Sequence, residues 1–165
     1  IQPDIHNVDC STDRNFQKFF NGFYKVRRNS TWQKSFYKLL EKNKNNNNIT
    51  FAEILTELFN KTNQYEGSFA SKLIASVNPK LPPFDQFTLI NLELKYLYDR
   101  SQRIKNHPER LRGIIEVYKA VCNKMNELSH SKLGKYLVKE FKQKFPKANI
   151  SVIKMVDLVL WQIRS

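Results

Sequence analysis

Apolar residues recur at three- and four-residue intervals along nearly the whole chain, and this periodicity constrains the fold more than any other feature. Only four glycines and six prolines are present, which leaves little of the turn chemistry that an all-β protein needs. A length of 165 residues suits one domain with its own hydrophobic core. The sequence therefore predicts an all-α protein, a single compact domain of about eight helices that covers residues 1–165.

Capping residues and prolines place the helix boundaries. Ser30 with Gln33 predicts a capping box at the start of one helix, and Thr50 with Glu53 predicts a second. Pro108 suits the first turn of a long helix. The expected helices lie near residues 16–28, 30–42, 50–59, 67–77, 85–92, 108–130, 131–145 and 150–164, and residues 96–106 are ambiguous.

The final expected helix is apolar on nearly every side, which is typical of a buried helix. We therefore expect a buried C-terminal helix that completes the core, with Trp161 enclosed. Residues 43–48 are rich in asparagine and lysine and predict a polar surface loop. No internal repeat or linker divides the chain.

The chain is strongly basic, with 28 Lys and Arg against 15 Asp and Glu, a net charge of +13. Such an excess bears on partners rather than on fold. Nucleic acid is the commonest polyanion that requires it, and we expect a nucleic-acid partner, with DNA favoured. No run of 18 apolar residues occurs. The sequence therefore predicts no membrane partner, and cytoplasm is the expected location.

A cluster of cations at the end of the first expected helix is the candidate nucleic-acid-binding site. Its members are Lys25, Arg27 and Arg28, and Lys34 and Lys38 would extend it on the next helix. The cluster could contact phosphates, or it could complement the dipole of a helix C-terminus. Three nearby aromatic residues could be base-stacking platforms or core residues: Tyr24, Trp32 and Tyr37.

Residues 67–92 hold two polar side chains with possible chemistry. Lys72 and Ser71 are expected to point away from an apolar stripe on a short helix, and Asp85 occupies the N-cap position of the next helix. A solvated lysine and an ordinary helix cap are the plainer interpretations. The stripe consists of Phe69, Ala70, Leu73, Ile74 and Val77.

This segment resembles the core of the helix-hairpin-helix DNA glycosylases, in which a hairpin leads to a lysine-bearing helix and an aspartate caps the next one. The resemblance implies that Asp85 is the catalytic aspartate and that Lys72 is the lysine that attacks the sugar of a flipped nucleotide. The chain also resembles uncharacterised bacterial helical proteins that share this segment and a terminal helix, here residues 157–164. That second resemblance implies no activity.

No metal site or cofactor is predicted. The chain has no cysteine cluster for an iron–sulfur centre, and its three histidines lack ligand spacing. Cys10 and Cys122 do not make a disulfide framework, and Cys122 is expected as a buried thiol on a helix.

Three functions remain open at this stage. The first is a basic helical nucleic-acid-binding protein with glycosylase-like base excision, and the second is a non-enzymatic helical module that binds DNA, RNA or an acidic protein. The third is a secreted helical bundle, which is favoured by the start at Ile1 and by sequons at Asn29, Asn48, Asn60 and Asn149.

Overall fold

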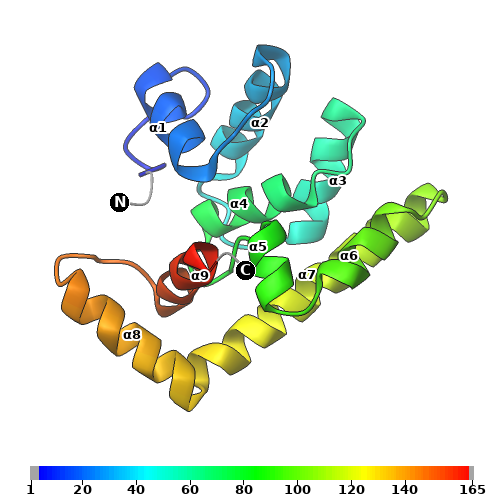
Figure 1. Ribbon diagram of the computed structural model, residues 1–165. Coiled ribbons are helices and arrows are strands. Elements are labelled where there is room, and N and C mark those ends of the chain that lie inside the picture. Colours follow the sequence, from blue (N-terminus) through cyan, green and yellow to red (C-terminus); the bar gives the residue numbers. More distant parts are fainter. Residues whose placement is uncertain (1–3, 164–165) are drawn as a thin grey trace. The chain divides into compact units, whose positions relative to one another are not determined.

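The computed structural model describes residues 4–163, and all regular structure among them is α-helical (Figure 1). This confirms the predicted all-α fold. Nine helices occur in that range, one more than the sequence indicated, because most of α6 falls within the ambiguous residues 96–106. They are α1 (Arg14–Tyr24), α2 (Ser30–Asn43), α3 (Phe51–Thr62), α4 (Gly67–Val77), α5 (Gln86–Asn91), α6 (Lys95–Gln102), α7 (His107–His130), α8 (Lys132–Lys144) and α9 (Val152–Gln162).

Contacts divide the chain into two compact units. The first unit, residues 1–78, contains α1 to α4, and the second unit, residues 79–165, contains α5 to α9. The prediction of a single domain stays a prediction.

In the first unit, α1 and α2 form an antiparallel hairpin. The Tyr37 hydroxyl lies 2.6 Å from Asn21 Oδ1 and 3.2 Å from the Gln17 carbonyl oxygen. Asn21 also donates from Nδ2 to Gln33 Oε1 at 2.9 Å. Position 17 therefore faces 37 and position 21 faces 33, which is the register of two antiparallel helices. Tyr24, Trp32 and Tyr37 are all buried, so these aromatic side chains belong to the core of this unit.

The N-cap of α2 differs from the sequence prediction. Asn29 accepts a hydrogen bond from the Trp32 amide at 2.9 Å, and α2 begins at Ser30. The capping box predicted at Ser30 and Gln33 is therefore wrong, because the extended backbone of Asn29 puts an equally suitable side-chain oxygen one residue earlier. The second predicted capping box, which opens α3 at Thr50, is confirmed.

Ser71 on α4 is fully buried, and its hydroxyl donates to the Ser68 carbonyl at 2.7 Å. One predicted boundary in the first unit needs correction. The helix α2 extends through Asn43, whose buried amide donates to the Leu39 carbonyl at 2.9 Å. The predicted surface loop therefore begins at Lys44 and not at residue 43.

The long helix α7 organises the second unit. The buried Tyr118 donates from its hydroxyl to the Pro82 carbonyl at 3.1 Å, and its ring centre lies 6.2 Å from that of Phe84. On another side, α6 approaches α7 where Gly113 faces Ser101, since a Cβ at position 113 would lie 3.0 Å from Ser101 Cβ. A methyl group at 113 would therefore require its neighbours at Ser101 and Ile104 to yield by a few tenths of an ångström.

A single residue, Ser131, joins α7 to α8 (Figure 1, yellow to orange). Beyond α8, the last helix α9 turns Met155 and Leu160 inward, together with a buried ion pair between Lys154 and Asp157 at 2.7 Å. Trp161 is only half-buried, so the prediction that it is enclosed is wrong. A helix that is apolar all round does not specify which side faces the core. The last residue of the predicted helix, Arg164, lies outside the described residues.

Candidate nucleic-acid interface

Asp85 caps α5, which confirms its predicted N-cap position. Its Oδ1 accepts hydrogen bonds from the amides of Phe87 and Thr88, both at 2.9 Å, and lies 3.3 Å from the Thr88 hydroxyl. The backbone of Asp85 is extended, as N-cap residues require. Its second oxygen, Oδ2, accepts no hydrogen bond within residues 4–163. The cap alone gives this aspartate a structural role.

Lys72 has a structural role as well. Its Nζ lies 3.3 Å from the Tyr24 carbonyl oxygen and 4.8 Å from the centre of the Phe69 ring. Because Tyr24 is the last residue of α1, this carbonyl is at the negative end of the helix dipole, where a cation is favourable. Lys72 belongs to the first unit and Asp85 to the second. The catalytic roles that the resemblance implies for them stay predictions.

Arg28, one member of the predicted cationic cluster, is paired with an acid. Its Nη2 lies 2.9 Å from Glu66 Oε1, and its guanidinium carbon lies 5.2 Å from the Phe69 ring centre and 5.8 Å from that of Trp32. The Glu66 side chain is only 8% exposed, so its charge needs a nearby cation. Arg28 therefore neutralises a buried carboxylate.

The other four predicted cations are exposed, and none makes an ion pair within the described part of the chain: Lys25, Arg27, Lys34 and Lys38. Lys25 ends α1 in the left-handed conformation, with a φ of 53°. Lys34 and Lys38 are four residues apart on α2 and so share one face of that helix.

The pairing of α1 with α2 adds Lys18 to that face. The two helices of an antiparallel hairpin are related by an approximate twofold axis, which is perpendicular to the plane that contains both helix axes. In each helix, the residue directly after one that contacts the other helix is therefore turned toward the same face of the hairpin. Lys18 follows Gln17, and Lys38 follows its partner Tyr37. We refer to Lys18, Lys34 and Lys38 as the hairpin face. Lys18 is exposed and forms no ion pair within residues 4–163.

Sequence reasoning missed Lys18 because nothing in the local pattern indicates the register between α1 and α2. It also missed a concentration of lysines in the second unit. Residues 132–147, which comprise α8 and the segment after it, contain six lysines against one glutamate. All six lysines are exposed. A count of charges in windows along the sequence would have found them.

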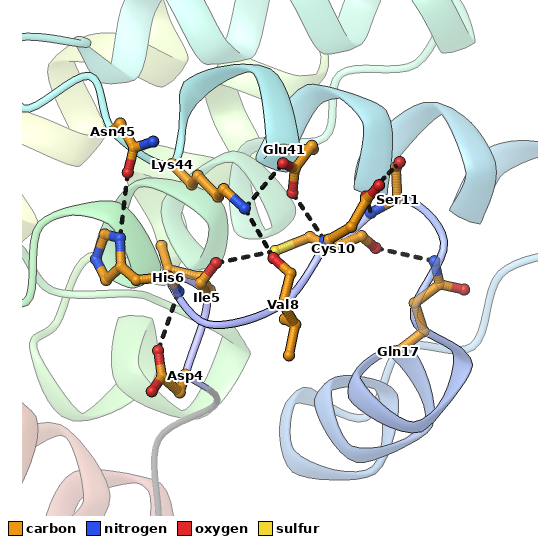
Figure 2. Close-up of polar contacts among 11 residues, drawn as sticks. Asp4, Ile5, His6, Val8, Cys10, Ser11, Gln17, Glu41, Lys44 and Asn45 are labelled. Carbon is orange, nitrogen blue, oxygen red and sulfur yellow. Dashed lines mark hydrogen bonds and ion pairs between the residues drawn. The ribbon is translucent and has the colours of Figure 1, made fainter.

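A polar network ties the N-terminal segment to the end of α2 (Figure 2). The Cys10 amide donates to Glu41 Oε2 at 2.8 Å. Lys44 Nζ lies 2.8 Å from Glu41 Oε1 and donates to the Val8 carbonyl at 2.7 Å. Burial raises the pKa of the Cys10 thiol to about 12. This thiol therefore stays protonated at neutral pH and is a poor nucleophile, and the network acts as an anchor for the segment.

Within the described residues, no group of three or more histidine, cysteine, aspartate or glutamate side chains is arranged to hold a metal ion. Cys10 and Cys122 are both free thiols; Cys122 is half-buried, and burial raises its pKa. None of the helices in residues 4–163 has the length and apolar character needed to cross a bilayer.

Comparison with known proteins returned no match: no family model, curated protein or solved structure is significantly similar to the chain.

Proposed function

We propose that this protein binds nucleic acid, with DNA favoured, through phosphate contacts made by the hairpin face. The observation that carries the proposal is the side-by-side placement of Lys18, Lys34 and Lys38, all exposed and without acidic partners in the described residues. When unpaired lysines contact phosphates, the counterions condensed on the nucleic acid are released, and this release drives sequence-independent binding. The net charge of +13 supports the same function by long-range attraction.

Glycosylase-like base excision is the second candidate function. One observation favours it: Oδ2 of Asp85 accepts no hydrogen bond from the described residues and so could face a substrate. Against it, the N-cap explains Asp85, and the end of α1 explains Lys72, without any chemistry. A binding module therefore agrees better with the geometry than an enzyme does.

The experiment measures affinity for a labelled duplex between about 50 and 200 mM salt, where the three phosphate contacts of the hairpin face would weaken binding roughly fortyfold, since each contributes about 0.9 to the salt slope. The double variant Lys34→Gln/Lys38→Gln should lower the slope of log affinity against log salt by about 1.8, because each lost contact removes about 0.9. Lys61→Gln/Lys105→Gln removes the same charge from exposed positions outside the hairpin face and is the matched control.

A slope that falls equally in both double variants would show that only net charge matters and would refute the role of the hairpin face. Absence of wild-type binding at low salt would refute the nucleic-acid function itself. For base excision, borohydride should trap a covalent adduct between the wild type and a duplex that carries a damaged base, and Lys72→Ala should remove the adduct if the lysine attacks the sugar.

A further inference from the structure

Four lysines form a continuous stripe along α8. Lys132, Lys135, Lys139 and Lys142 are spaced by three, four and three residues, so they lie on one face of the helix over a rise of about 15 Å. All four are exposed, and none makes an ion pair in the part of the chain that the structure describes. We call these four residues the α8 stripe.

The α8 stripe is unfavourable for the helix that carries it. Neighbouring lysines three and four positions apart repel one another. Lys132 is also the first residue of α8, where the helix dipole disfavours a cation. None of the four lysines forms an ion pair with an acidic side chain of the described residues, whereas a chain of phosphates along the stripe would neutralise all of them.

An exposed aromatic side chain borders the stripe. Tyr136 is 58% exposed and takes part in no described hydrogen bond or ring contact. Its position, four residues after Lys132 and three before Lys139, places it at the edge of the stripe. A cationic track with an unpaired aromatic ring beside it is the arrangement that holds single-stranded nucleic acid, since bases that are not paired can stack on the ring.

The same surface is a poor match for two other polyanions. On a helical wheel, Glu140 falls between Tyr136 and the exposed Leu133, so a carboxylate interrupts the apolar flank that a lipid surface would need to bury. A duplex would neutralise the lysines, but its bases are already stacked and would leave the tyrosine ring without a partner.

We propose that the α8 stripe and Tyr136 form a binding site for single-stranded nucleic acid, with the lysines on the phosphates and the tyrosine ring stacked on a base. The inference rests on the proposed nucleic-acid function and specifies its substrate class. It concerns a surface of the second unit, separate in sequence from the hairpin face of the first. The two surfaces can therefore be tested independently.

The test compares the affinities of the full chain for labelled oligo-dT of about 20 nucleotides, the corresponding duplex, and phosphatidylcholine vesicles that contain phosphatidylserine. Tyr136→Leu keeps a good helix former but removes the ring, and it should weaken oligo-dT binding on the order of tenfold without changing duplex binding. Tyr136→Phe keeps the ring and should bind like the wild type.

The lysines are tested with Lys135→Gln/Lys139→Gln. This variant should lower the salt slope for oligo-dT by about 1.4, because each phosphate contact to a single strand contributes about 0.7. Its melting temperature should be unchanged or higher, since like charges have been removed, so weaker binding could not be attributed to unfolding.

Three results would overturn the proposal. The first is that Tyr136→Leu binds oligo-dT as tightly as the wild type does. The second is that the wild type binds the anionic vesicles more tightly than any oligonucleotide. The third is that Tyr136→Leu and Lys135→Gln/Lys139→Gln both leave oligo-dT affinity unchanged while Lys34→Gln/Lys38→Gln weakens duplex binding; the proposed function would then stand without this site. A wild type that binds no nucleic acid would refute both proposals.

Discussion

Replacement of Gly134 by alanine should destabilise the corner between α7 and α8. A Cβ added at this position would lie 1.8 Å from the Leu128 carbonyl oxygen and 2.7 Å from its carbonyl carbon. Ordinary contacts begin near 3.4 Å, so the two backbone segments would have to separate by more than 1 Å. Neither segment can yield by rotating a side chain, because the atoms that collide belong to the main chain.

The magnitude follows from the contacts at that corner. The Leu128 carbonyl accepts a hydrogen bond from the Ser131 hydroxyl at 2.7 Å, and that hydroxyl accepts one from the Gly134 amide at 3.0 Å. Overpacking costs about 1–3 kcal/mol and loss of the Ser131 cap about 1 kcal/mol, while alanine in place of glycine returns about 1 kcal/mol. The expected net loss is about 1–3 kcal/mol.

Thermal unfolding followed by circular dichroism measures this loss. A loss of about 2 kcal/mol should lower the melting temperature by roughly 4–8 °C in a chain of this size. Gly22→Ala is the control, because a Cβ at position 22 meets nothing within 4 Å and the residue lies inside α1. That change should raise stability by about 0.5–1 kcal/mol. A Gly134→Ala protein at least as stable as the wild type would refute the close approach of the two helices.

Two further perturbations test individual side chains. Asp85→Asn should leave stability unchanged because asparagine caps as well as aspartate, whereas Asp85→Ala should cost about 1 kcal/mol in chemical denaturation; equal stabilities of the two variants would contradict the cap. For Glu41, burial by itself raises the pKa, but hydrogen bonds from Lys44 and the Cys10 amide outweigh it and hold the pKa below its ordinary value. Its contribution to stability is therefore complete above the unfolded pKa of about 4.3 and is lost as the pH falls through the folded value. Glu41→Gln should accordingly be less stable than the wild type at neutral pH, and the difference should shrink below about pH 4; a difference that is constant with pH, or matched by the exposed Glu140→Gln, would contradict the network.

The local structure of this protein could be predicted from its sequence because local rules decide it. Helix periodicity, the capping box at Thr50, the cap at Asp85 and the proline that opens α7 depend on residues within one or two turns of each other. Where local options were nearly equal, as between Asn29 and Ser30 at the start of α2, the sequence did not separate them. Either side chain offers a suitable oxygen, and only the backbone conformation of the connection decides which one caps.

The candidate sites depend on contacts between residues far apart in the chain, and these were decided only by the tertiary structure. Arg28 is 38 positions from Glu66, and Lys72 is 48 positions from Tyr24; no local pattern shows that these two cations already have partners. Lys18 joins Lys34 and Lys38 only through the register of two helices. The sequence by itself determined an all-α chain with an excess of positive charge. Packing determined which cations stabilise the fold and which remain exposed. A cation stabilises the fold where packing places it beside a buried carboxylate or the C-terminal end of a helix, because its charge neutralises theirs.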